Sequence, residues 1–157
     1  MSPFIKVIKL VLAIVFCQGA GIIGMIFTTP AIATWYKTIN KPAINPPNWI
    51  FGPVWFTLYT LMGVALFIVW IDTKPKVSAI TVFIIQLALN AVWSIVFFGY
   101  HNPFYAFIVI IALWFSILFS IILFWKISDI AGYLLLPYIG WVTFAAFLNY
   151  SIWRLNG

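Results

Sequence analysis

Ionisable side chains are scarce in this chain. Only 6% of its 157 residues are charged, and it contains no glutamate, two aspartates, one histidine and one cysteine. An ordinary soluble domain has roughly 25% charged residues. Such a sparse set excludes a carboxylate pair, a catalytic triad or a metal cluster inside the core, and it argues against an ion-coupled pump. The single cysteine excludes an internal disulfide.

Long apolar runs fill most of the chain instead, because hydrophobic residues make up 66% of it. A transmembrane helix needs roughly 20 predominantly apolar residues. Five segments meet this length, and Lys9 is the only charged residue within them: residues 7–27, 49–71, 77–99, 104–125 and 130–153. The sequence therefore predicts an all-α integral membrane protein, a five-transmembrane-helix bundle in a single domain covering residues 1–157.

The first connection, residues 28–48, is the only long one, and it contains Trp35, Tyr36 and several prolines. Proline fixes backbone angles and indole rings offer amphipathic contact area, so such a loop can be ordered without regular structure. Long loops in compact proteins usually carry function. We expect a structured lid over a membrane cavity.

An odd number of helices places the two termini on opposite sides of the membrane. Five of the eight basic residues lie on the N-terminal side, so the positive-inside rule favours a cytoplasmic N terminus. Isoleucine-rich helices favour a bacterial cell membrane, with the mitochondrial outer membrane as the alternative. The net charge of +6 is spread over both sides and predicts no nucleic-acid partner.

Polar and aromatic residues form stripes on three predicted helices. One stripe each comes from the second, third and fifth segments: Trp55, Tyr59 and Met62; Gln86, Asn90 and Trp93; Pro137, Trp141, Ala145 and Asn149. Facing one another, these stripes would line a cavity for a flat, mostly apolar ligand with a few polar edges. The alternative is that the amides only hydrogen-bond between helices.

Small residues recur every fourth position in two other places. They are Ala13, Cys17 and Gly21, with Ala20 and Gly24 beside them, and Ala112, Ser116 and Ser120. Such stripes let helices pack closely, either within one protomer or across a homodimer.

The chain resembles the tryptophan-rich TspO/MBR family, which includes the translocator proteins or peripheral-type benzodiazepine receptors. The resemblance covers nearly the whole chain. It is carried by WY at Trp35, KP at Lys41, PPNWIFGPVWFTLYTLMG from Pro46, QLALNAVWSIVFF from Gln86 and LLLPYIGWVTFAAFLNYSIWRLN from Leu134. Several long motifs in order are specific evidence.

The resemblance implies a membrane protein, often a homodimer, with no cofactor but with porphyrin ligands such as protoporphyrin IX or haem, and in many members cholesterol or synthetic benzodiazepine-type ligands. Carried over by position, the ligand-binding residues are Trp35, Tyr36, Pro46, Trp55, Tyr59, Asn90, Trp93, Trp141 and Ala145. Leu148, Tyr150 and Arg154 match the family's sterol motif, a pattern that an ordinary interfacial anchor also produces.

One departure from the family concerns the dimer. The third segment lacks the small-xxx-small stripe through which some members dimerise, because Val92 and Ile95 follow Ala88 and Ala91 at the fourth position. The sequence therefore does not identify the face through which a dimer would form.

Three functions remain. The first is a receptor or transporter-like protein that binds a tetrapyrrole between its indoles, with the propionates near Lys37 and Lys41. The second is a light-dependent enzyme that degrades protoporphyrin, for which Trp55 and Trp141 match the implicated indoles. The third is a ligand-responsive regulatory scaffold in stress signalling.

Overall fold

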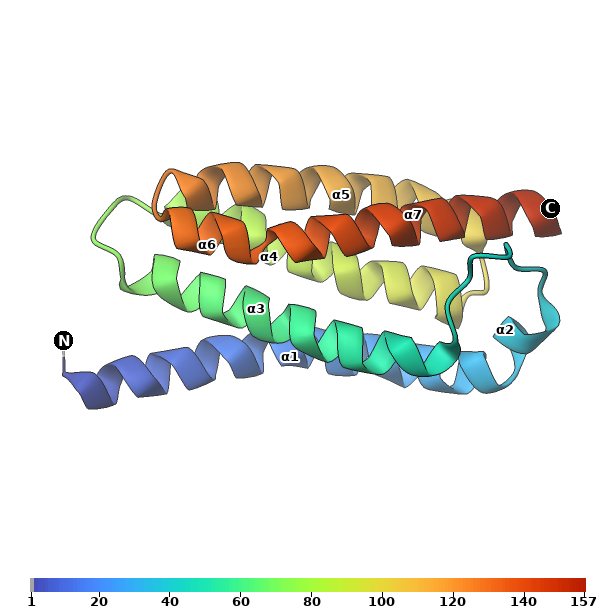
Figure 1. Ribbon diagram of the computed structural model, residues 1–157, viewed down its shortest axis with the longest axis horizontal. Helices are drawn as coiled ribbons and strands as arrows, with labels where there is room; N and C mark the ends of the chain where they lie inside the picture. The colour runs from blue at the N-terminus through green and yellow to red at the C-terminus, as the bar shows by residue number, and fades with distance from the viewer. Residues whose placement is uncertain (1) are drawn as a thin grey trace.

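A computed structural model describes residues 2–157, and long helices run side by side along one axis of it (Figure 1). The elements in order are α1 (Pro3–Ala33), α2 (Trp35–Thr38), η1 (Asn48–Ile50), α3 (Phe51–Ile71), α4 (Val77–Ser94), η2 (Ile95–Gly99), α5 (Pro103–Trp125), α6 (Asp129–Leu134) and α7 (Leu136–Asn156).

Five stretches are long and apolar enough to cross a membrane: Pro3–Ala33, Asn48–Ile71, Val77–Gly99, Pro103–Trp125 and Asp129–Asn156. Residues 2–157 contain no strand. The two ends of the chain lie at opposite ends of the bundle (Figure 1). The predicted five-helix membrane bundle is therefore confirmed, and the chain is a multi-pass membrane protein.

The first helix is longer than the predicted residues 7–27. It begins after Ser2, whose Oγ accepts a hydrogen bond from the Ile5 N–H (3.4 Å), and it continues through Pro30 to Ala33. A proline inside a helix removes one backbone donor, here the one that would bond the Ile26 carbonyl, and membrane helices tolerate such a loss. At the end of the helix, Thr34 Oγ1 donates to the Pro30 carbonyl at 2.8 Å. The lid loop therefore begins at Thr34 rather than at residue 28.

The third and fifth spans are each interrupted once. The third continues from α4 into the π-helical turn η2, and the fifth divides into α6 and α7 at Leu135, two residues before Pro137. Ser128 is the N-cap residue of α6, but its side chain makes no capping hydrogen bond. Proline at the start of α7 fits the first helical turn, where its missing N–H costs nothing.

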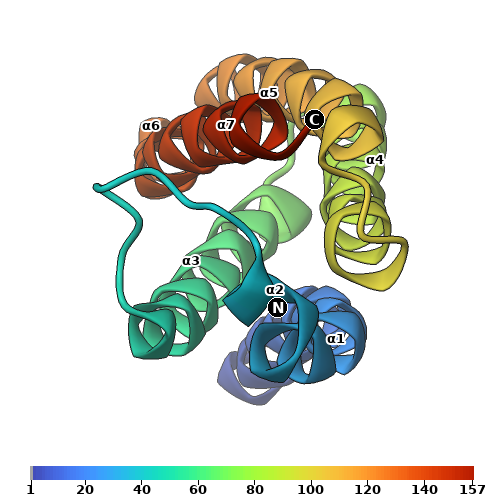
Figure 2. The same cartoon turned by 90° about the vertical axis from the view of Figure 1, so that its right-hand side faces the viewer.

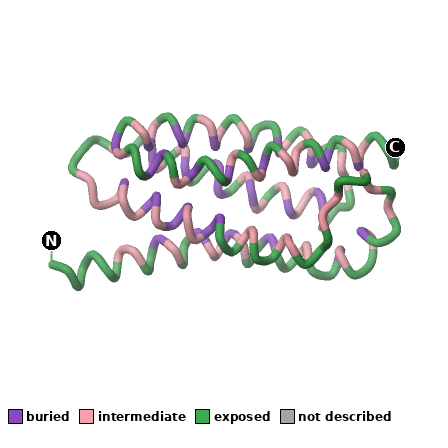
Figure 3. Tube along the Cα trace, viewed as in Figure 1, coloured by how far each residue is buried: buried purple, intermediate pink, exposed green. Residues whose placement is uncertain are grey.

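The bundle is closed by contacts between neighbouring helices. Seen from the lid end, α1 and α3 lie together, α5 and α7 lie together, and α4 stands between α5 and α1 (Figure 2). Buried residues follow the inward faces of these helices, and exposed ones cover the outside (Figure 3). Most of the outward-facing residues are large and apolar, as a lipid-facing surface requires.

Small residues bring α1 close to α3. Gly63 of α3 lies against the α1 backbone, so closely that a Cβ built there would be 2.5 Å from the Ile14 Cα. On α1 the small residues Ala13, Cys17, Ala20 and Gly24 are all buried. This stripe packs within the protomer, which is the first of the two interpretations of its spacing.

Candidate functional site

A large cavity lies in the half of the bundle nearest the lid. Its volume is about 530 Å³, within the 300–1,000 Å³ typical of small-molecule sites. Four helices supply its walls: α1, the start of α3, the end of α4 with η2, and α7. No acidic, basic or histidine side chain lines it. The cavity therefore suits an uncharged, largely apolar ligand body.

Five of the nine predicted ligand-binding residues line this cavity. They are Trp55, Tyr59, Trp93, Trp141 and Ala145. Three indoles thus converge from α3, α4 and α7. Trp55 stacks on Tyr59 with ring centroids 5.5 Å apart, and Trp141 meets Phe51 edge-on at 6.2 Å. Stacked and edge-on aromatic pairs of this kind hold their rings in fixed orientations.

Asn90 does not line the cavity. It is 1% exposed, and its amide is occupied on both sides: Oδ1 accepts the Tyr59 hydroxyl at 2.7 Å, and Nδ2 donates to the Tyr138 hydroxyl at 2.8 Å. Tyr138 in turn donates to Gln86 Oε1 at 2.8 Å. These four side chains form one buried network that joins α3, α4 and α7. Gln86 and Asn90 therefore hydrogen-bond between helices, which was the alternative to lining a cavity. Asn90 influences the cavity only through its hydrogen bond with Tyr59.

Trp93 is oriented by a second polar contact. Its indole N–H donates to Asn149 Oδ1 at 2.9 Å, and Asn149 Nδ2 donates to the Pro103 carbonyl at 2.7 Å. The ring of Trp93 stacks on Phe97 at 5.4 Å. Its donor is therefore used within the protein, so Trp93 presents mainly its ring to the cavity.

The lid residues Trp35, Tyr36 and Pro46 lie outside the cavity wall. Trp35 and Tyr36 pack with Phe97 in a separate apolar cluster at the end of the bundle. The Tyr36 hydroxyl donates to Asn45 Oδ1 at 2.7 Å, and Asn45 Nδ2 donates to the Pro46 carbonyl at 3.2 Å. Burial raises the pKa of Tyr36 above its usual range, and the hydrogen bond to Asn45 opposes this rise. The phenol therefore stays neutral at physiological pH. These contacts stabilise the conformation of the lid, and they do not place its side chains in the cavity.

Two further contacts attach the lid to the bundle. The side chain of Asn156, at the end of α7, accepts from the Asn40 N–H and donates to the Asn40 carbonyl, both at 2.9 Å. The Trp35 ring stacks on the His101 ring with centroids 4.6 Å apart. Within the lid itself, Lys41 Nζ donates to the carbonyls of Tyr36 and Ile39. The contacts of Asn40 and Trp35 hold the lid across the end of the bundle.

The three residues of the sterol motif do not share a surface. Leu148 is 5% exposed and faces the bundle, whereas Tyr150 is 44% exposed and Arg154 is also exposed. Because each residue turns a helix by about 100°, Tyr150 and Arg154 point about 160° and about 120° away from Leu148. Tyr150 and Arg154 flank Trp153, with the Arg154 Cζ 5.9 Å from the Trp153 ring.

The contribution of α1 was not predicted from the sequence. Eight of its residues line the cavity: Gln18, Gly21, Ile22, Gly24, Met25, Thr28, Thr29 and Ile32. Gly21 lies against Tyr59, because a Cβ there would be 2.6 Å from the ring. The small-residue stripe was the available signal, since a helix that approaches so closely must also form part of the wall.

Comparison with known proteins agrees with this geometry. A profile described as the TspO/MBR family matches residues 13–154. The chain belongs to the TspO/MBR family. A tryptophan-rich protein TspO of Archaeoglobus fulgidus is 41% identical over 156 residues, which cover 96% of this chain and 99% of that protein. The human translocator protein is 35% identical over 126 residues, covering 78% and 75% of the two chains. A tryptophan-rich sensory protein of Cereibacter sphaeroides is 36% identical over 122 residues, covering 78% and 77%.

In this TspO/MBR chain, no acidic, basic, histidine or cysteine side chain lines the cavity. Residues 2–157 contain no cluster of three or more histidine, cysteine or acidic side chains that could hold a metal. The wall offers aromatic faces, hydroxyls and amides. Such a wall can bind, orient and enclose a ligand, and it can exchange electrons through its indoles.

The buried network gives a first testable prediction. Asn90→Leu removes the acceptor of the Tyr59 hydroxyl, and we expect it to lower the free energy of unfolding by about 2 kcal/mol. Tyr59→Phe removes the hydroxyl itself and should cost less. Reversible unfolding in mixed micelles would measure both variants and the double variant. If the stability losses of the two single variants add up to that of the double variant, Tyr59 and Asn90 are not coupled. That result would contradict the hydrogen-bonded network.

Proposed function

We propose that this TspO/MBR protein binds a tetrapyrrole such as protoporphyrin IX or haem in the cavity between α1, α3, α4 and α7. The observation that carries the proposal is the convergence of Trp55, Trp93 and Trp141, from three different helices, on one uncharged cavity. A porphyrin is flat, aromatic and apolar except at its propionates. Stacking on indole rings suits such a ligand in an apolar wall.

The propionates then have to leave the cavity, because its lining contains no cation. The lid end carries Lys37, which is exposed, and Lys41, whose ammonium is already occupied by two carbonyls. We therefore assign the propionates to the lid-side interface near Lys37. Charge attraction there is exposed to water and is weakened by salt.

Binding is favoured over coupled transport because the only acidic or histidine side chain in the membrane-spanning segments is Asp129, the first residue of the last one. Sterol binding at Leu148, Tyr150 and Arg154 has weaker support, since Leu148 is buried. A homodimer remains a prediction, as does placement in a bacterial cell membrane. Two relatives that match 96% of this chain are prokaryotic, which favours a prokaryotic cell membrane over a mitochondrial one.

A light-dependent enzyme is the second candidate. Trp55 and Trp141 both line the cavity, so a bound porphyrin would contact both indoles. Electron transfer from an indole needs no acid–base pair. The third candidate is a ligand-responsive scaffold; the printed name of the Cereibacter sphaeroides relative, a tryptophan-rich sensory protein, suggests sensing for that protein.

Titration of the detergent-purified protein with protoporphyrin IX in the dark tests the proposal. Tryptophan fluorescence should be quenched saturably, and Trp141→Phe should weaken binding. Trp125→Phe is the matched control, because Trp125 packs against Tyr133 at the end of the bundle away from the lid. Quenching that neither saturates nor responds to Trp141→Phe would overturn the proposal.

Illumination of the saturated complex separates a binder from an enzyme. Loss of the porphyrin absorbance that depends on Trp55 and Trp141 would favour degradation. A stable spectrum would favour binding alone, and a partner protein captured only with ligand would favour the scaffold.

A further inference from the structure

One buried hydroxyl in the bundle is left without a hydrogen-bond partner. Five amide or serine side chains are buried within residues 2–157: Gln86, Asn90, Ser94, Ser120 and Asn149. Both amides of α4, the amide of α7 and the serine of α5 are hydrogen-bonded. The Ser94 hydroxyl makes no hydrogen bond within these residues, although Ser94 is only 7% exposed. Buried polar groups are normally paired, so this exception needs an explanation.

Ser94 differs in this respect from other hydroxyls of the bundle. Thr28 Oγ1 and Ser120 Oγ each donate to the carbonyl four residues before them, at 2.9 and 2.8 Å. Hydroxyls in membrane helices commonly bond in this way. Ser94 is the last residue of α4, directly before the π-helical turn η2, and its hydroxyl does not bond the Asn90 carbonyl. Its donor therefore stays available, next to a kind of turn that is frequent at functional sites.

The free hydroxyl faces the larger cavity. No polar side-chain atom that the protein encloses completely lacks a partner within residues 2–157, so Ser94 Oγ reaches open space. The open space beside it is the cavity, whose wall includes Ser94. Gly24 of α1 lies opposite, and a Cβ there would be 3.0 Å from Ser94 Oγ. Glycine at position 24 thus leaves the hydroxyl uncovered.

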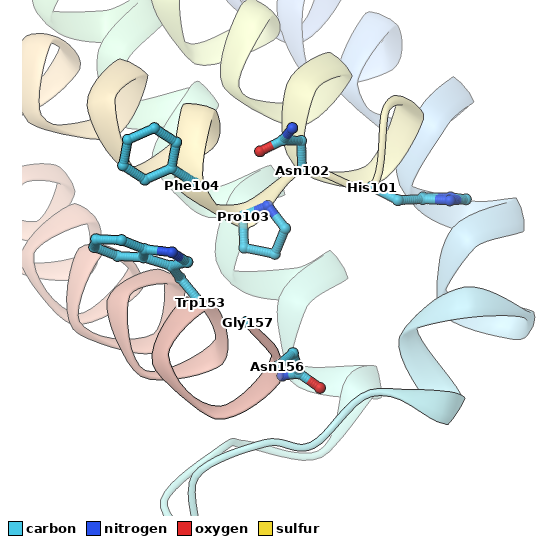
Figure 4. Close-up of a pocket in the computed structure, with 7 residues that line it drawn as sticks. All are labelled: His101, Asn102, Pro103, Phe104, Trp153, Asn156 and Gly157. Carbon is cyan, nitrogen blue, oxygen red and sulfur yellow. The ribbon is translucent and has the colours of Figure 1, made fainter.

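The smaller hollow at the lid end offers no comparable group. Asn102 and Asn156 are two of its lining residues (Figure 4). Neither side chain is buried. Asn156 is bonded to the backbone of Asn40, and Asn102 accepts from the Tyr105 N–H at 3.1 Å. Within residues 2–157 the unpaired buried hydroxyl therefore belongs to the larger cavity alone.

Ser94 lies at the inner end of that cavity on the α4 side. The chain of α4 runs toward the lid end (Figure 1). Asn90, one turn further from the lid, is closed off by its hydrogen bonds to Tyr59 and Tyr138. Toward the lid, Phe98 continues the wall. A flat ligand whose anionic groups point to the lid therefore places its opposite edge near Ser94.

We infer that Ser94 Oγ is a specificity-determining contact, which hydrogen-bonds an uncharged hydroxyl or carbonyl group on the ligand edge that faces away from the lid. The inference rests on the proposed function. The group is uncharged because no charged side chain lines the cavity to compensate for a buried charge. A buried hydroxyl that the ligand leaves unpaired costs free energy. Ser94 therefore favours a ligand with a matching group over one with an alkyl group at the same place.

Two porphyrins differ in the property that matters here. Haematoporphyrin IX carries hydroxyethyl groups where mesoporphyrin IX carries ethyl groups, on the edge opposite the propionates. When the propionates lie at the lid-side interface, these groups face the inner end of the cavity. The hydroxyl of Ser94 can then pair with haematoporphyrin but not with mesoporphyrin.

The test measures the affinity of both porphyrins in the dark, by quenching of tryptophan fluorescence, for the detergent-purified wild type and for Ser94→Ala. The ratio of the haematoporphyrin affinity to the mesoporphyrin affinity should fall about fivefold in Ser94→Ala, the effect of one hydrogen bond. Comparing the ratios cancels the unequal partition of the two porphyrins into micelles. Mesoporphyrin binding by the variant shows that it is folded. If Ser94→Ala bound neither porphyrin, Ser94→Cys, which keeps the side-chain size but is a weak donor, decides with the same ratio.

Ser120→Ala is the matched control, because it removes the hydroxyl of a buried serine on α5 that does not line the cavity. It should leave the ratio at the wild-type value. A ratio unchanged by the deciding variant at Ser94, or lowered equally by Ser120→Ala, would overturn the inference and leave the proposed function standing. Mesoporphyrin binding to the wild type that does not saturate would instead overturn the proposed function, and the inference with it.

Discussion

Ala145→Phe is expected to lower the affinity for protoporphyrin IX by about two orders of magnitude, a loss of about 3 kcal/mol. Ala145 is a small residue in the cavity wall on α7, between the levels of Trp141 and Asn149. A phenylalanine ring there fills space that the ligand needs, and the close-packed wall cannot retreat without cost. A dark fluorescence titration measures the change.

Gly140→Phe is the control for this substitution. Gly140 lies on the same helix, is exposed, and would have no heavy atom within 4 Å of an added Cβ. The added ring then points into lipid, and the affinity should match that of the wild type. An equal loss in both variants would mean that the added ring disturbs α7 as a whole, which contradicts the assignment of Ala145 to the binding site.

Gly63→Ala is expected to produce the largest loss of stability, about 3 kcal/mol, because overpacking at a rigid contact costs about 1–3 kcal/mol. A Cβ at this position would be 2.5 Å from the Ile14 Cα and 2.9 Å from the Ile14 N. These are backbone atoms, so no side-chain rotation relieves the clash. The whole of α1 has to move away from α3, and this movement also widens the cavity between these helices.

Gly19→Ala is the comparison for Gly63→Ala. Gly19 lies on α1, and an added Cβ there would meet nothing within 4 Å. It should be neutral or slightly stabilising, since alanine favours a helix over glycine. Both variants would be measured by unfolding in mixed micelles. A Gly63→Ala protein as stable as Gly19→Ala would show that α1 and α3 are not in close contact.

The helix bundle could be predicted from the sequence, whereas some helix ends could not. The lengths of the apolar segments alone predict five spans, because a helix needs roughly 20 apolar residues to cross the hydrocarbon core. The end of α1 was placed too early, because Pro30 and three threonines resemble a loop. A membrane helix tolerates an interior proline, and this one continues through Pro30 to Ala33.

The candidate site was predicted in part. The indoles Trp55, Trp93 and Trp141 follow from the face that each occupies on its helix, and the structure brings them to one cavity. Asn90 lies on the same helix face as Trp93, but its amide nitrogen donates to the hydroxyl of Tyr138 on the fifth span instead of facing the cavity. Periodicity gives the face of a residue and not its hydrogen-bond partner. The wall formed by α1 was missed because glycine and threonine positions carry no aromatic signal.

The most direct test of the central claim, that the ligand occupies this cavity, is protection of a cavity thiol. In a Cys17→Ala background, Thr28→Cys places a thiol in the α1 wall, and Ser78→Cys places one at an exposed site at the other end of the bundle. The rate of reaction with a small methanethiosulfonate reagent would be measured in the dark with and without protoporphyrin IX. At a ligand concentration ten times Kd, the rate at Thr28→Cys should fall about tenfold while that at Ser78→Cys stays constant. An unchanged rate at Thr28→Cys under saturating porphyrin would contradict the account.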